Sequence, residues 1–113
     1  MLTENGFTFK KVILAVGKSD LRKGIDGLAA MVRLKYGLDP LEKDTLFLFC
    51  GIRRGRLKGL LWTGGRFILL CIRLSDGCFQ RPRTAQEARS ISAEEFKRLM
   101  DGFAIDQPFE FFC

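Results

Sequence analysis

The sequence predicts an α+β domain in which a mostly antiparallel sheet packs against one or two helices. Its 113 residues have room for one hydrophobic core. The mean hydropathy of +0.05 is typical of a globular chain. The predicted elements follow the order strand, helix, four strands, helix. We therefore expect a single domain over residues 1–113, with a core at about 8–103 and a C-terminal tail at 104–113.

The first two elements are a strand and the helix that follows it. Residues 11–16 are apolar after Lys11 and rich in β-branched side chains, which predicts a strand. Ser19 and Asp20 offer N-capping oxygens, so we expect a helix at about 20–36 that ends near Gly37. The apolar residues at helical spacing, which should form its buried stripe, are Leu21, Ile25, Leu28 and Val32.

Two glycines lie inside this predicted helix. Gly24 and Gly27 each cost about 1 kcal/mol relative to alanine in a helix interior. Their spacing of three residues indicates that another backbone packs closely against the helix.

Three runs in the middle of the chain predict strands. They are residues 45–50, 56–62 and 66–74. The Gly64–Gly65 pair between the last two runs favours a two-residue turn with positive φ, so these strands should form a hairpin that pairs Thr63 with Arg66. A second turn at Asp76–Gly77 leads into a short predicted strand at 78–81.

A second helix is predicted near the C-terminus. Ser92 and Glu95 have the spacing of a capping box, in which each side chain bonds the other residue's backbone N–H. The apolar face that follows comprises Phe96, Leu99, Met100 and Phe103.

The charge distribution and the absence of histidine limit the function. The chain has 19 lysines and arginines, 13 acidic residues and no histidine, for a net charge of +6. Without histidine, Ser-His-Asp triads, histidine metal ligands and imidazole proton transfer are excluded. Residues 51–89 hold nine basic residues against two acidic ones, whereas residues 90–113 are net acidic. This favours a protein that binds a polyanion over an enzyme.

The predicted hairpin register assigns its side chains to two faces. The apolar face, which belongs to the core, comprises Leu57, Gly59, Leu61, Ile68, Leu70 and Ile72. The mixed face comprises Arg56, Lys58, Leu60, Trp62, Phe67, Leu69, Cys71 and Arg73. Arg56 faces Arg73 there, and like charges directly opposite each other are destabilising unless an anion neutralises them.

The mixed face is therefore the candidate nucleic-acid surface. Arginine and lysine side chains bind phosphates, and Trp62 and Phe67 are candidates for stacking on bases. The candidate phosphate-binding residues of this segment are Arg53, Arg54, Arg56, Lys58, Arg66 and Arg73. The alternative is a solvated sheet face kept soluble by its charge, with both aromatic side chains covered by a helix.

Catalytic and metal-binding patterns are weak. The four cysteines form no Cys-x-x-Cys pair, and we expect Cys50 and Cys71 to be small buried core residues. Asp20 and Asp26 could belong to a carboxylate metal site of a nuclease, but Asp20 is better explained as a helix cap and Asp26 as an ion-pair partner of Arg22. We expect no catalytic residue, no metal and no cofactor.

No signal peptide is evident, and no apolar run is long enough to cross a membrane. Both observations predict a cytoplasmic protein without membrane association. Disulfide bonds are not expected in that compartment.

The segment SDLRKGIDGL at residues 19–28 resembles the opening motif of TnpB-type accessory proteins from insertion-sequence family 66, which are unrelated to the RNA-guided nucleases of the same name. The other matching blocks are Leu46–Cys50, Arg53–Arg54, Arg56–Lys58, Trp62, Gly64, Phe67, Arg73–Leu74, Gly77, Phe79, Pro82 and Ser92–Glu95. The resemblance covers about residues 11–103. The chain departs from the family at Gly51, Thr63 and Arg81, where asparagine, an acidic residue and tryptophan are usual.

The resemblance implies a non-catalytic role in transposition, as an accessory to a separate transposase. It also adds Arg22 and Lys23 to the candidate DNA-binding residues. The expected partners are DNA at the ends of the element and the transposase of the same element.

The alternative is a protein-interaction module that docks on the transposase without touching DNA. The acidic last helix and the tail residues Phe109, Phe111 and Phe112 favour it. An end that alternates aromatic and acidic residues could add to a partner's sheet edge or cover the domain's own sheet.

Overall fold

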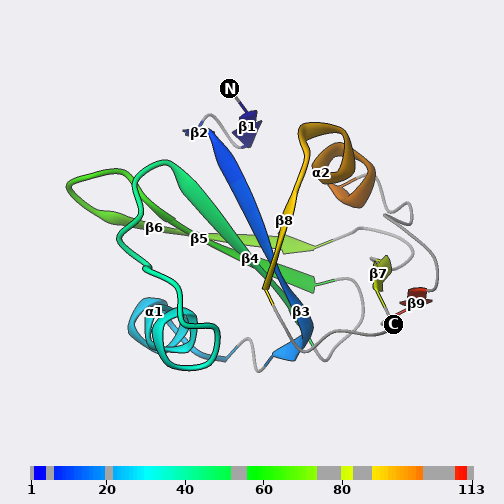
Figure 1. Cartoon of the computed structure of the whole chain (residues 1–113), viewed down its shortest axis with the longest axis horizontal. Coiled ribbons are helices and arrows are strands. Elements are labelled where there is room, and N and C mark those ends of the chain that lie inside the picture. The colour runs from blue at the N-terminus through cyan, green and yellow to red at the C-terminus, as the bar shows by residue number, and fades with distance from the viewer. Residues whose placement is uncertain are drawn as a thin grey trace.

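The computed structural model describes the backbone of residues 2–4, 7–19, 22–51, 56–73, 80–82, 88–100 and 109–111. It describes the side chains of residues 9–15, 22–51, 56–73 and 90–100. The elements in chain order are β1 (Leu2–Glu4), β2 (Phe7–Phe9), β3 (Lys11–Ser19), α1 (Ile25–Leu34), β4 (Thr45–Gly51), β5 (Arg56–Trp62), β6 (Phe67–Arg73), β7 (Gln80–Pro82), β8 (Ala88–Ile91), α2 (Ala93–Met100) and β9 (Phe109–Phe111) (Figure 1).

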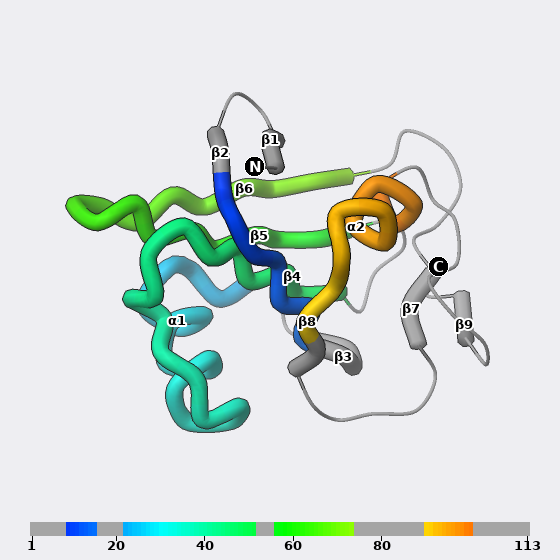
Figure 2. Tube along the Cα trace, turned by 45° about the horizontal axis from the view of Figure 1, so that its top comes forward, coloured from blue at the N-terminus to red at the C-terminus, as the bar shows by residue number. Residues whose placement is uncertain are grey.

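The main sheet has the strand order β6-β5-β4-β3-β8, and β6 lies at one edge of it (Figure 2). Only the β3–β4 pair among these neighbours is parallel. A parallel pair needs a crossover connection, and α1 lies within that connection. The short strands form separate pairs, β1 with β2 and β7 with β9. The predicted α+β class with a mostly antiparallel sheet is thereby confirmed.

The two helices cover opposite faces of the sheet. β4 shows this directly, because its seven residues are all buried and residues 46–50 alternate between two apolar clusters. Leu48 lies in the cluster that contains Phe96 and Leu99 of α2, and Phe49 lies in the cluster that contains Leu28 of α1. Figure 1 shows the helices on different sides of the strands. The core therefore has two layers with the sheet between them.

The predicted start of the first helix was wrong. Ser19 belongs to β3, where it pairs with Gly51 of β4 after a register shift between Ala15 and Lys18. The N-cap of α1 is Gly24, which has no side-chain capping bond. Ser19 has the side chain of a good N-cap, but pairing along β4 keeps it in the strand. The predicted cap Asp20 and the stripe residue Leu21 lie outside the described residues, while Leu28 and Val32 of the stripe are buried as expected.

The predicted close approach of a second backbone to the two glycines was also wrong. Among the described residues beyond its two chain neighbours, none has an atom within 4 Å of the position that a Cβ on Gly24 would occupy. A Cβ on Gly27 would lie 3.0 Å from the Cβ of Lys23, so the neighbour of Gly27 is the stem of a side chain four residues earlier. Gly37, with a φ of +65°, lies just beyond the end of α1 as expected.

The hairpin prediction is confirmed in register as well as in position. Arg56 pairs with Arg73 and Trp62 with Phe67, which is the predicted set of partners. Gly64 has a φ of +94°, and the Thr63 N–H donates to the Arg66 carbonyl at 3.1 Å. The two-residue turn therefore determines which side chains share a face along the whole hairpin.

The capping box of α2 is confirmed by both of its hydrogen bonds. The Glu95 N–H donates to the Ser92 hydroxyl at 3.1 Å, and the Ser92 N–H donates to the Glu95 carboxylate at 3.0 Å. Phe96 and Leu99 are buried as predicted, and Phe103 lies outside the described residues.

Four strands were not predicted, namely β1, β2, β8 and β9. β8 pairs with β3 through partners such as Val12 with Ile91. The predicted strand at 78–81 corresponds to β7, and the Asp76–Gly77 turn lies outside the described residues. β9 in the tail pairs with β7, Glu110 opposite Arg81, so part of the tail joins a strand pair within the same chain.

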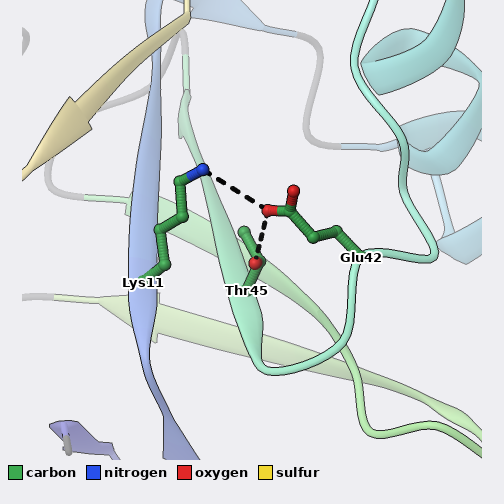
Figure 3. A network of polar contacts seen from close by, with 3 residues as sticks. All are labelled: Lys11, Glu42 and Thr45. Atoms are coloured by element: carbon green, nitrogen blue, oxygen red, sulfur yellow. Dashed lines mark hydrogen bonds and ion pairs between the residues drawn. The ribbon is translucent and has the colours of Figure 1, made fainter.

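A polar network joins the parallel strands β3 and β4 at their first residues (Figure 3). The Thr45 hydroxyl donates to the Glu42 carboxylate at 2.7 Å, and the Lys11 Nζ lies 3.6 Å from the same oxygen. Asp44, with a φ of 59°, accepts from the Lys10 N–H at 2.8 Å and donates its own N–H to the Trp62 carbonyl at 3.1 Å. These bonds link the starts of β3 and β4 to the end of β5.

Candidate nucleic-acid interface

The mixed face of the hairpin is divided along its length. At the turn end, Leu60, Phe67 and Leu69 pack in the cluster that α1 covers. At the other end the same face carries Arg56, Lys58 and Arg73. Because α1 covers the apolar part, it leaves the basic part at the surface, with Arg73 exposed and Arg56 and Lys58 half-buried. The mixed face is therefore apolar and covered at its turn end, and basic and accessible at its other end.

Two arginines oppose each other at the basic end. Arg56 and Arg73 are direct cross-strand partners. Within the described part of the chain, neither of them forms an ion pair, whereas Lys11 pairs with Glu42 near the start of β4. Like charges at a cross-strand pair cost stability unless an anion lies between them. The structure therefore keeps an unbalanced positive charge at this place.

The start of α1 adds to this charge. The Lys58 Nζ donates a hydrogen bond to the Lys23 carbonyl oxygen at 3.4 Å, although the two residues are 35 positions apart. Both Arg22 and Lys23 are exposed. This contact and the hairpin register bring together Lys23, Arg56, Lys58 and Arg73. We use the name basic surface for these four residues and Arg22, the exposed residue before Lys23.

Arg66 is separate from the basic surface. It is exposed beside the turn, at the opposite end of β6 from Arg73. At a strand rise of about 3.3 Å per residue, seven residues place the two arginines roughly 23 Å apart. Its basic neighbour there is Lys43, whose Cε lies 3.3 Å from where a Cβ of Gly64 would be. Sequence reasoning missed Lys43, because only the fold brings its loop against the turn.

The two aromatic candidates contact each other. The ring centroids of Trp62 and Phe67 lie 4.8 Å apart with an interplanar angle of 59°. Both side chains are half-buried, and Phe67 also packs against the cluster beneath α1. Cross-strand aromatic pairs of this kind stabilise a hairpin near its turn.

Two predicted residues, Arg53 and Arg54, lie in the connection between β4 and β5, outside the described residues. The residues on either side of that connection are described. Gly51 ends β4, and Arg56 begins β5 at the basic surface.

The expectation of two buried cysteines is half correct. Cys50 is fully buried, as predicted, but Cys71 is exposed. Cys71 is opposite Lys58, at the end of the hairpin that α1 does not cover. The sequence pattern around Cys71 is that of a core strand, and its exposure follows from the position of β6 at the sheet edge.

The structure adds two findings on metal sites and membranes. In the ranges that it describes, no three cysteine or acidic side chains gather as metal ligands, and Asp20 of the candidate nuclease site lies outside those ranges. Neither α1 nor α2 has the length and apolar character that a membrane crossing requires.

Comparison with known proteins connects this fold to a family. Two proteins of Sinorhizobium fredii, the uncharacterized proteins y4jC and y4hO, are each 34% identical to the chain. The matches cover 81% of this chain and 78% of y4jC, and 88% of this chain and 86% of y4hO. No solved structure matches the chain.

A family model described as IS66 Orf2-like protein matches residues 10–110. That range contains the central sheet from β3 to β8, both helices and the basic surface. The match supports the resemblance seen in the sequence motifs, and it links the chain to transposition by insertion sequences. The chain belongs to the IS66 Orf2-like family.

Proposed function

We propose that the chain is a non-catalytic accessory protein of transposition that binds DNA through its basic surface and assists a separate transposase. The observation that carries the proposal is the pairing of Arg56 with Arg73, next to the Lys58–Lys23 contact and without an ion-pair partner for either arginine among the described residues. A phosphate group between the two guanidinium groups would relieve their repulsion and accept hydrogen bonds from both.

Binding of this kind has a measurable salt dependence. Each phosphate that a lysine or arginine neutralises releases counterions, so the logarithm of the binding constant falls linearly with the logarithm of salt concentration. If all five residues of the basic surface contact phosphates of a duplex, the slope is about −4 to −5. The DNA expected is that of the element ends.

The test compares two double variants with the same loss of charge. Arg56→Ala with Lys58→Ala removes two cations from the basic surface. Arg33→Ala with Lys97→Ala removes one exposed arginine and one exposed lysine elsewhere, from the last turn of α1 and from α2. Fluorescence anisotropy with element-end DNA at several salt concentrations should show a flatter slope and weaker binding for the first variant alone. Equal losses in both variants, or binding without salt dependence, would contradict the proposal.

A second candidate function is docking on the transposase without DNA contact. It is favoured by the alternation of aromatic and acidic residues in the tail, where Phe109–Phe111 forms a strand able to pair with another strand. In the structure that strand pairs with β7. Deletion of residues 104–113 should reduce capture of the purified transposase if the tail is the docking element, and undiminished capture would exclude the tail.

A further inference from the structure

The outer edge of β6, which no other described strand pairs with, differs from the edges that proteins usually leave open. β6 spans seven residues, Phe67–Arg73, and among the described strands it pairs only with β5. The run from Phe67 to Ile72 contains no charge, proline or glycine. Open edges of this length are normally protected by charged residues, proline or a bulge, because they otherwise pair with other chains. The opposite edge, β8, has only four residues and includes Arg89 and Ser90.

The hydrogen-bond pattern shows which residues of β6 direct their backbone groups outward. The bond from the Thr63 N–H to the Arg66 carbonyl makes these two a hydrogen-bonded pair. Hydrogen-bonded and non-hydrogen-bonded pairs alternate along an antiparallel ladder. The residues whose N–H and carbonyl groups point away from β5 are therefore Phe67, Leu69, Cys71 and Arg73. Trp62, the partner of Phe67, agrees with this pattern, because its carbonyl points away from β6 and accepts from the Asp44 N–H.

We propose that a second copy of this chain pairs with β6 in antiparallel orientation, which joins the five strands of each copy into one continuous sheet. The two-fold axis passes between Leu70 and the partner's Leu70. In this register Leu69 is opposite the partner's Cys71, and Phe67 is opposite the partner's Arg73. This antiparallel register pairs all seven residues of β6 with the partner strand. It also joins residues whose backbone groups point outward, so that they can form hydrogen bonds.

The side chains of β6 are complementary to themselves in this register. On one face Ile68 is opposite the partner's Ile72, and on the other Leu69 is opposite the partner's Cys71, so apolar residues meet on both faces. Arg73 meets an aromatic ring rather than a second arginine, an arrangement that favours cation–π contact. Because each copy has one such edge, pairing uses both edges and closes the assembly as a dimer.

The dimer would place the two basic surfaces on the same face of the joined sheet. The two-fold axis is perpendicular to the sheet, and rotation about such an axis does not exchange the two faces. The proposal does not rest on DNA binding, because the oligomeric state is measured without DNA. DNA binding by a monomer, or a dimer that binds no DNA, would separate the two proposals.

The first test removes the outward N–H of Cys71. Cys71→Pro removes a group that makes no bond to β5, and proline is tolerated at such positions of edge strands. Because the substitution is present in both copies, it removes two hydrogen bonds from the interface. We therefore expect the dimer dissociation constant to rise at least about 30-fold. Sedimentation equilibrium of the full chain, whose monomer mass is 12.8 kDa, measures this change. Cys71→Ser is the matched control, because it keeps the N–H and should remain dimeric.

A second variant and a cross-linking experiment cover the case in which Cys71→Pro fails to fold. Cys71→Lys keeps the backbone and places a charge at the centre of the edge, so it should also be monomeric. In the proposed dimer the two Cys71 side chains are diagonal neighbours on one face, about 7–8 Å apart. A short bis-maleimide should therefore link two chains in which Cys78 and Cys113 are replaced by serine, and should not link them when Cys71→Ser is added.

Three results would overturn the inference. The wild-type chain could sediment as a monomer at all concentrations, which would leave the edge for a different partner such as the transposase. A folded Cys71→Pro or Cys71→Lys variant could remain dimeric, which would place the interface elsewhere. Cross-linking could also be unaffected by removal of Cys71.

Discussion

The Nζ atom of Lys58 donates a hydrogen bond to the carbonyl oxygen of Lys23 at 3.4 Å. Lys58 lies in the middle of β5, and Lys23 immediately precedes the N-cap of α1. The contact joins two basic segments that are 35 residues apart in the chain. Charges at the start of α1 and on the hairpin thus form one surface. The proposed DNA contact therefore involves more than one element of the fold.

Lys58→Met should weaken DNA binding with little effect on folding. Methionine keeps most of the apolar stem but removes the charge and the donor. Loss of one phosphate contact should reduce the magnitude of the salt slope by about 1. Anisotropy titrations at several salt concentrations measure the slope, with Lys97→Met on the exposed face of α2 as the control. A slope unchanged from the wild type would show that Lys58 does not contact phosphate.

Arg73→Glu should move stability and DNA affinity in opposite directions. Replacement of the Arg56–Arg73 repulsion by attraction should raise the free energy of unfolding by about 0.2–1 kcal/mol. The same change inverts a charge of the basic surface and should weaken DNA binding. Urea titration and anisotropy measure the two effects. Arg56→Glu with Arg73→Glu is the stability control, since like charges again oppose each other in that double variant, and an equal gain there would refute the explanation.

Gly59→Ala should destabilise the fold by about 1–3 kcal/mol through overpacking. A Cβ on Gly59 would lie 3.0 Å from the Leu46 Cδ1, between two strands in the core, and 3.6 Å from the Leu70 Cβ. Gly65→Ala is the control, because no atom lies within 4 Å of that Cβ position. Thermal unfolding followed by circular dichroism measures both. Similar losses for the two variants would point to glycine's backbone freedom instead of packing.

Ser92→Ala should cost about 0.5–2 kcal/mol of stability, because it leaves the Glu95 N–H without its acceptor at the start of α2. Ser90→Ala, at an exposed position two residues earlier in β8, should change stability by much less. Urea titration of the two variants is the measurement. Equal stability of both variants would mean that packing of Phe96 and Leu99 alone holds the helix in place.

Local chemistry was sufficient to predict several parts of this fold. The Gly64–Gly65 turn and the alternation of side chains predicted the hairpin with its correct register, since both depend on neighbouring residues. Ser92 and Glu95 predicted the start of α2 for the same reason. The opposition of Arg56 and Arg73, on which the proposed function rests, was therefore available from the sequence.

The tertiary structure decided what depends on distant partners. Ser19 is a good N-cap by itself, yet pairing with Gly51 holds it in β3. β8 has a weak pattern of its own and forms a strand because β3 offers it an edge. The sequence could not show that Cys71 is exposed, that Lys43 lies against the turn or that Lys58 reaches Lys23, because each depends on how separate elements pack. Residue type and spacing set the local conformations, and long-range pairing determined which charges share one surface.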